Sequence, residues 1–66
     1  MRLELKVLRT KSNLTQNQMA DRLGVTRVNY LLIENGKSNG TLKFWDRLQS
    51  EFGLTPKKLE QIRKNK

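Results

Sequence analysis

The fold of this chain is decided by residues 14–37, which read LTQNQMADRLGVTRVNYLLIENGK. Thr15 is a favoured N-cap residue, and Gln18 follows three residues later, which is the spacing of a capping box at the start of a helix. Gly24 comes after the last apolar residue of that helix, where glycine adopts the left-handed backbone angle at least cost. Thr26 is then placed to cap a second helix. The stretch therefore predicts two short helices joined by a tight turn.

Three further helices are expected around this pair, because glycine, threonine and proline divide the rest of the chain at helix-length intervals. Apolar residues recur one turn apart in each, as in amphipathic helices. The sequence thus predicts an all-α fold, a compact five-helix bundle without a strand, as a single domain over residues 1–66. The three helices are residues 3–11, with Leu5 and Leu8 among charged neighbours Arg2, Lys6 and Arg9; residues 42–52, with Leu42, Trp45, Leu48 and Phe52 at helical spacing; and a last helix from Pro56, with Leu59 and Ile62 inward.

Length and composition exclude several classes of protein. Sixty-six residues, 35% of them hydrophobic, allow one small core. The chain has no Cys and no His, which removes disulfides, thiolate nucleophiles, imidazole bases and the usual zinc sites. Its longest apolar run, residues 30–33, is far shorter than the roughly 20 residues that cross a bilayer, and the N-terminus lacks a signal-peptide pattern. We therefore expect no metal, no cofactor, no membrane contact and a cytoplasmic location.

The charge of the chain indicates a polyanionic partner. Fourteen Lys and Arg against six Asp and Glu give a net charge of +8. Nucleic acid is the first partner to consider, although ribosomal proteins and membrane-surface peptides share such a charge. The six carboxylates are scattered, and none is paired with another for acid–base chemistry. We therefore do not expect an enzyme.

Residues 16–35 resemble a helix-turn-helix unit. Their apolar positions fall where the two helices would face each other and the core, and the second helix would project into a groove about 12 Å wide. The wider string resembles the phage Cro and repressor family, the XRE type of bacterial DNA-binding domain with the lambda-repressor-like fold. The motifs that carry this resemblance are Leu8-Arg9, Leu14-Thr15-Gln16, Leu23-Gly24-Val25-Thr26, Ile33-Glu34-Asn35-Gly36-Lys37 and Phe52-Gly53-Leu54.

The resemblance implies a bacterial or phage transcriptional regulator that binds operator DNA as a dimer, with the second helix of the unit in the major groove. In such proteins the start of the first helix and the loop after the second contact phosphates, and the second helix reads base edges. It also implies a structural ion pair between Arg9 and Glu34. Carried over to this sequence, the DNA-binding residues are Gln16, Thr26, Arg27, Val28, Asn29, Leu32, Asn35 and Lys37.

Three of these residues have a specific expected role on the bases. Arg27 is suited to bridge a guanine, and Val28 is suited to pack on a thymine methyl group. Asn29 is suited to pair with an adenine or to contact a phosphate, and the sequence leaves both open.

The sequence also departs from the family pattern. Leu31 and Leu32 stand where the family often has polar residues, and they have three open roles: contact with thymine methyl groups, burial against the loop, or a protein interface. Tyr30 is larger than the usual aliphatic residue, and we expect its hydroxyl at the rim. Asn39 and Gly40 replace a common proline, which predicts a more flexible loop before the helix at residues 42–52.

A second reading of the same fold is an antitoxin or phage regulatory module that chiefly binds another protein through Leu31, Leu32 or the last helix. For the DNA-binding reading, we expect a homodimer, because one short helix reads only a few base pairs. We expect it to be weak in solution and firm on DNA, because some of its apolar residues must close the core and leave little exposed area. The expected dimer surface is the end of the helix at residues 42–52 together with the last helix. Its apolar residues are Phe52, Leu54, Leu59 and Ile62.

Overall fold

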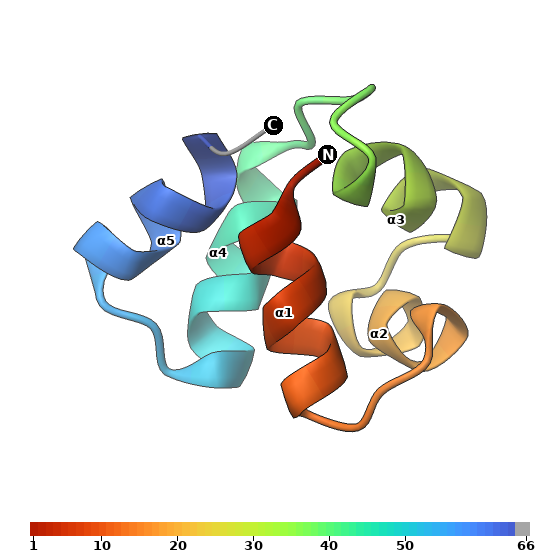
Figure 1. The fold of residues 1–66 in the computed structure, drawn as a ribbon, viewed down its shortest axis with the longest axis horizontal. Helices are drawn as coiled ribbons and strands as arrows, with labels where there is room; N and C mark the ends of the chain where they lie inside the picture. The colour runs from red at the N-terminus through yellow and green to blue at the C-terminus, as the bar shows by residue number, and fades with distance from the viewer. Residues whose placement is uncertain (65–66) are drawn as a thin grey trace.

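The computed structural model describes residues 1–64 and contains helices and loops but no strand within that range. In Figure 1, α2 and α3 form a pair on one side, α1 lies in the centre in front of α4, and α5 lies on the other side. The all-α five-helix prediction is confirmed. The helices are α1 (Leu3–Lys11), α2 (Gln16–Leu23), α3 (Arg27–Glu34), α4 (Leu42–Phe52) and α5 (Pro56–Lys64).

Side-chain caps place the ends of α2 and α3 as predicted. The Thr15 hydroxyl accepts the backbone N–H of Gln18 at 3.1 Å, and the Gln18 side-chain oxygen accepts the N–H of Thr15 at 2.9 Å. This reciprocal pair is the predicted capping box. Gly24 ends α2 at φ +70°, and the Thr26 hydroxyl accepts the N–H of Asn29 at the start of α3. The turn between the two helices is therefore fixed by local chemistry.

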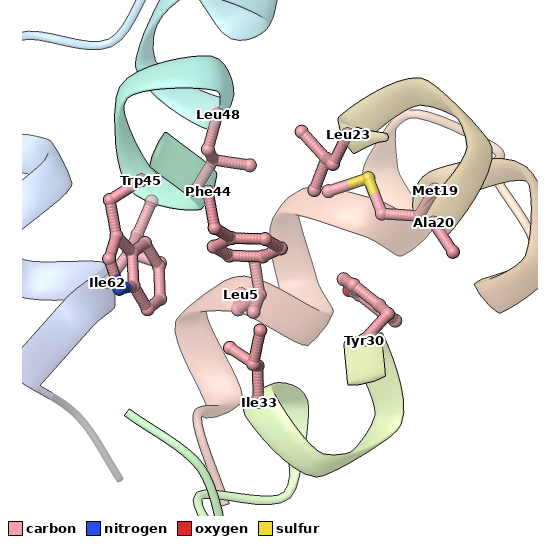
Figure 2. Close-up of a cluster of buried hydrophobic side chains, with 10 residues drawn as sticks. All are labelled: Leu5, Met19, Ala20, Leu23, Tyr30, Ile33, Phe44, Trp45, Leu48 and Ile62. Atoms are coloured by element: carbon pink, nitrogen blue, oxygen red, sulfur yellow. The ribbon is translucent and has the colours of Figure 1, made fainter. Parts of the chain in front are cut away.

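One cluster of buried side chains drawn from all five helices forms the core (Figure 2). Leu42 stands at helical spacing with the other apolar residues of α4 but does not join this cluster, because its side chain is 83% exposed. Phe44 is buried instead and meets Trp45 edge-on, with ring centroids 4.8 Å apart. Leu42 lies about 100° around the helix from the buried face, so its spacing does not bring it inward. The cluster consists of Leu5, Met19, Ala20, Leu23, Tyr30, Ile33, Phe44, Trp45, Leu48 and Ile62.

Arg2 is buried, although its charge predicts a solvated position beside α1. Its Nε donates to the carbonyl of Arg63 at 3.0 Å, and its Nη1 donates to the carbonyls of Ile33 and Ser38. Its guanidinium also lies 5.2 Å from the Trp45 ring centroid. Burial, and secondarily the positive Arg63, lower the pKa of Arg2. The buried guanidinium of Arg2 has no carboxylate partner among the described residues. Its charge is stabilised instead by carbonyls at the negative ends of α3 and α5 and by the face of the Trp45 ring.

The apolar residues at the end of α4 and on α5 close the core. Ile62 is fully buried, and Phe52, Leu54 and Leu59 are half-buried against the central cluster. Ile62 therefore has no exposed surface to offer the predicted dimer, whereas Phe52, Leu54 and Leu59 stay partly exposed, and a dimer surface built from them remains a prediction. No helix within residues 1–64 is both long and apolar enough to cross a membrane.

Candidate nucleic-acid interface

α3 has one buried face and one solvent-facing face. Tyr30, Ile33 and Glu34 are buried, and Leu31 is half-buried. The structure places the predicted base-reading residues on the exposed side of α3 and at its N-cap. These residues are Thr26, Arg27, Val28, Asn29 and Leu32.

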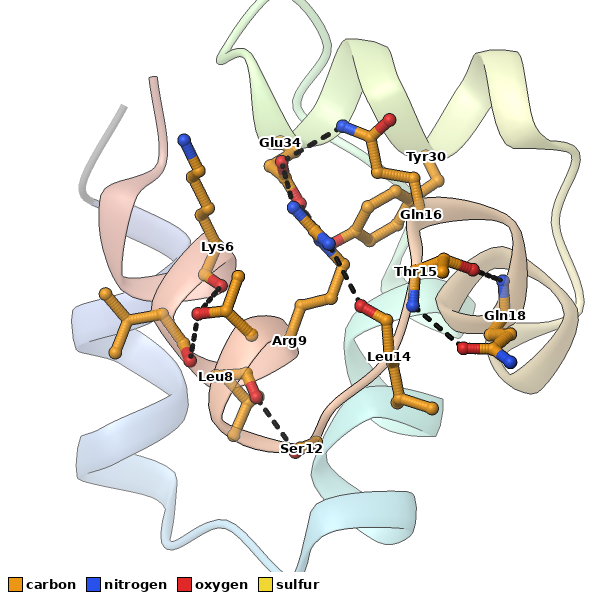
Figure 3. Close-up of polar contacts among 12 residues, drawn as sticks. Lys6, Leu8, Arg9, Ser12, Leu14, Thr15, Gln16, Gln18, Tyr30 and Glu34 are labelled. Carbon is orange, nitrogen blue, oxygen red and sulfur yellow. Dashed lines mark hydrogen bonds and ion pairs between the residues drawn. The ribbon is translucent and has the colours of Figure 1, made fainter.

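The buried face of α3 is anchored through the carboxylate of Glu34 (Figure 3). Arg9 of α1 donates to it from Nε at 2.9 Å, and the Tyr30 hydroxyl donates to the same oxygen at 2.5 Å. The predicted Arg9–Glu34 ion pair is confirmed. The expectation that the Tyr30 hydroxyl lies at the rim is wrong, because Glu34 sits one turn further along α3 and draws the hydroxyl inward. α3 is thereby locked to α1.

The protonation states of this cluster follow from its geometry. Burial alone raises the pKa of Glu34, but hydrogen bonds from Arg9 and Tyr30 outweigh it and hold the pKa below its ordinary value. Burial, reinforced by the hydrogen bond to Glu34, raises the pKa of Tyr30 far above its usual range. The hydrogen bond with Glu34 raises the pKa of Arg9. Glu34 is therefore an ionised, neutralised anchor, and it adds little negative potential next to α3.

Gln16 lies at the first turn of α2, next to the end of α3. Its side-chain amide reaches Oε1 of Glu34 at 3.5 Å, at the limit of a hydrogen bond, and the residue is half-buried (Figure 3). The first backbone amides of a helix have no acceptor within the helix, so those of Gln16 and Asn17 point outward from α2. Gln16 thus reaches Glu34, the residue that directly precedes Asn35 at the C-cap of α3.

Hydrogen bonds to backbone carbonyls hold the loop that follows α3. Leu32 accepts the N–H groups of Lys37 and Ser38 at 2.9 and 3.1 Å. The Ser38 carbonyl accepts Nη1 of Arg2 at 2.7 Å, and the Asn39 carbonyl accepts the indole N–H of Trp45 at 2.9 Å. Arg2 and Trp45 thus hold two carbonyls of the loop, and its greater flexibility remains a prediction. Lys37 remains exposed at its outer edge.

Ion pairing leaves an uneven charge distribution. Four of the six carboxylates, those of Glu4, Glu34, Glu51 and Glu60, are paired with Lys or Arg side chains. Among the residues that the structure describes, the exposed cations outside any ion pair are Lys6, Lys11, Arg27, Lys37, Lys43 and Lys57.

Three of these cations lie near α3 along the chain. Arg27 is the first residue of α3, Lys37 lies in the loop after it, and Lys43 lies in the first turn of α4. A hollow of about 150 Å³ links Lys43 to the turn before α3, since Gly24, Val25 and Lys43 all line it. Lys43 is not among the DNA-binding residues predicted from the sequence, and its only signal there is its place in the helix turn that follows the predicted phosphate-contacting loop. The α3 region therefore carries positive charge that no ion pair within residues 1–64 neutralises.

Comparisons with known proteins agree with this geometry. A protein named uncharacterized HTH-type transcriptional regulator from Archaeoglobus fulgidus is 37% identical over 62 residues, which cover 94% of this chain and 83% of that protein. Another of that type, from Methanocaldococcus jannaschii, is 39% identical over 62 residues, with 94% and 89% covered. The comparison with solved structures found no match. A family profile described as helix-turn-helix matches residues 5–59, and the chain therefore belongs to the helix-turn-helix family of the Cro and repressor (XRE) type, whose members are DNA-binding proteins and not enzymes.

Proposed function

We propose that this chain is a sequence-specific, double-stranded DNA-binding transcriptional regulator that lays α3 in the major groove of operator DNA. The observation that carries the proposal is the exposed face of α3, accompanied by the cations Arg27, Lys37 and Lys43, which form no ion pair with any residue from 1 to 64. DNA phosphates attract such cations and repel carboxylates. The major groove is wide enough to admit an α-helix. The names of the two archaeal relatives support the regulatory role.

The proposed division of work follows from position. Gln16 with the free amides of α2, and Asn35 and Lys37 in the loop after α3, contact phosphates and set the register of the protein on the duplex. Arg27 and Asn29 at the start of α3 read base edges. Thr26 caps α3 and presents its backbone to the groove. We add Lys43 to the phosphate-contacting set, because it lies in the first turn of the helix that follows the loop.

Two variants and a range of salt concentrations test this division. For the wild-type chain, the logarithm of the DNA affinity should fall with the logarithm of salt concentration by about 0.9 per phosphate contact. Lys37→Ala should weaken binding to all duplexes alike and lower that slope by about 1. Arg27→Ala should cost about 1–3 kcal/mol on the best site and relax base preference there. A flat salt response, or equal losses on specific and random DNA for both variants, would refute the proposal.

The dimer is part of the proposal. One short recognition helix spans only a few base pairs, so two copies on half-sites about 34 Å apart would supply the missing specificity. Sedimentation should show mostly monomer for the free chain and two chains per duplex in the complex. A tight complex of one chain on a non-palindromic site would contradict the dimer. A cytoplasmic location follows from the role, and origin in a bacterium or phage stays a prediction beside the archaeal relatives.

A second candidate function is a module that binds another protein, as an antitoxin does. The exposed apolar side chains of Val28 and Leu32 on α3 favour it. The two functions separate in one assay: a gel shift of duplex DNA by the isolated chain supports the regulator, and a shift that requires an added partner supports the module.

A further inference from the structure

The solvent-facing side of α3 has an apolar centre. At 3.6 residues per turn, the side of α3 opposite the buried Tyr30 and Ile33 is centred on Val28 and Leu32. These two side chains are one turn apart, and they are 63% and 39% exposed. We call them the Val28–Leu32 strip.

The strip occupies the middle of the face that the proposed function places in the major groove. Neither side chain carries a polar atom, so neither can exchange a hydrogen bond with a base edge. The apolar group that bases present in the major groove is the C5 methyl of thymine. A cytosine methylated at C5 presents the same group at the same ring position. The chemistry of the strip therefore matches a 5-methylpyrimidine.

A protein partner fits the strip less well. Stable protein interfaces bury about 1,200–2,000 Å² in total, and their centres are depleted in charged residues. The strip consists of only two side chains, which follow each other along α3. Arg27 lies beside Val28, and Lys37 lies in the loop beyond Leu32. Neither cation has an ion-pair partner within residues 1–64. A narrow apolar strip accompanied by free cations is complementary to methyl groups lined on both sides by phosphates.

We propose that Val28 and Leu32 make DNA recognition by this chain depend on the 5-methyl groups of pyrimidines, one read by each side chain, with thymine and 5-methylcytosine equivalent in this respect. The inference rests on the proposed function and adds the chemical class of base that α3 selects. It also assigns the apolar face of α3 to DNA in preference to a protein partner.

The test starts from the duplex that the purified wild-type chain enriches from a random pool. In that duplex, each thymidine is replaced in turn by deoxyuridine, which lacks only the methyl group. Burying one methyl against a side chain corresponds to a loss of about four-fold in affinity when it is removed. Such losses are expected at two positions in each half-site. At those positions, a 5-methylcytosine–guanine pair should bind about four-fold tighter than a cytosine–guanine pair.

Variants assign each methyl group to a side chain. Val28→Ala should abolish the deoxyuridine effect at one position and Leu32→Ala at the other, each leaving the second position sensitive. Leu42→Ala is the matched control, because Leu42 is an exposed apolar residue on α4. It should keep both effects. All three side chains are exposed, so circular dichroism should report folded chains.

The outcomes separate this inference from the proposed function. Enriched duplexes that bind with no deoxyuridine effect, or with effects that persist unchanged in Val28→Ala and Leu32→Ala, would overturn methyl reading and leave DNA binding standing. A chain that enriches no duplex would overturn both.

Discussion

The hydroxyl oxygen of Tyr30 lies 2.5 Å from Oε2 of Glu34, one turn further along α3, and both residues are closed off from solvent. Arg9 donates to the same carboxylate from α1. A buried carboxylate with two strong donors is well satisfied, but each member of such a cluster depends on the others. The position of the proposed recognition helix thus rests on a polar cluster as well as on apolar packing.

Glu34→Ala should destabilise the chain severely. It leaves the charge of Arg9 and the hydroxyl of Tyr30 without their main acceptor, and breaking a buried pair in this way costs about 3–5 kcal/mol. A domain this small has only a few kcal/mol of net stability. Urea unfolding should therefore show a largely unfolded population without denaturant. Glu60→Ala, which removes an exposed pair with Arg63, should change the free energy of unfolding by no more than about 0.5–1 kcal/mol. Similar losses for the two variants would contradict the anchoring role.

Alkaline pH should unfold the chain through Tyr30. Because the pKa of the folded phenol is raised above its unfolded value near 10, the stabilisation is fully present below about pH 10. It is lost as the pH rises further, since the unfolded phenol gives up a proton that the folded one keeps. Tyr30 is the only tyrosine, so ultraviolet absorbance of tyrosinate reports it alone. The denatured chain should titrate near pH 10, and the folded chain should ionise only as it unfolds. In Tyr30→Phe, stability should fall less above pH 10. If the Tyr30 phenol of the folded chain ionises near pH 10 without unfolding, this prediction is wrong.

Arg2 should be irreplaceable by lysine. Its Nε and Nη1 serve three carbonyls, those of Ile33, Ser38 and Arg63, and a single ammonium group cannot reproduce that fork. Arg2→Lys should lower the free energy of unfolding by about 1–3 kcal/mol, the cost of buried acceptors left without donors. Lys57→Met, at an exposed position, should stay within about 0.5 kcal/mol. If thermal unfolding shows Arg2→Lys as stable as wild type, the buried fork is not needed.

Gly40→Ala should destabilise the folded chain more than Gly53→Ala does. Both glycines have left-handed backbone angles, φ +73° and +60°, which cost an alanine roughly 1–2 kcal/mol. A Cβ on Gly40 would lie 2.9 Å from the indole nitrogen of Trp45, whereas a Cβ on Gly53 meets nothing within 4 Å. Gly40→Ala must therefore also disturb the bond from Trp45 to the Asn39 carbonyl. Its melting temperature should be lower and the fluorescence of the single tryptophan altered. Equal effects of the two substitutions would show that Trp45 moves aside freely.

The helix boundaries could be predicted from the sequence because short-range chemistry sets them. A hydroxyl three residues before a backbone N–H and a glycine with a left-handed angle are local features, as at Thr15 and Gly24. The exposed face of α3 follows from its 3.6-residue period in the same way.

What failed depends on contacts between distant parts of the chain. Arg2 is buried because two helix ends and Trp45 converge on it, and no pattern near Arg2 encodes that meeting. The inward turn of the Tyr30 hydroxyl had a local signal, since Glu34 stands four residues later, but Arg9 is needed to complete the cluster. Leu42 is the exception, because the helical period alone places Phe44, and not Leu42, on the face of α4 that buries Trp45 and Leu48.

The central claim is that the α3 side of the molecule binds DNA, and amide chemical-shift mapping with the enriched duplex tests it most directly. We expect the largest changes on the first turn of α2, on residues 26–38 and on Lys43, with α5 nearly unaffected. Changes concentrated on α5 with α3 unperturbed would contradict it.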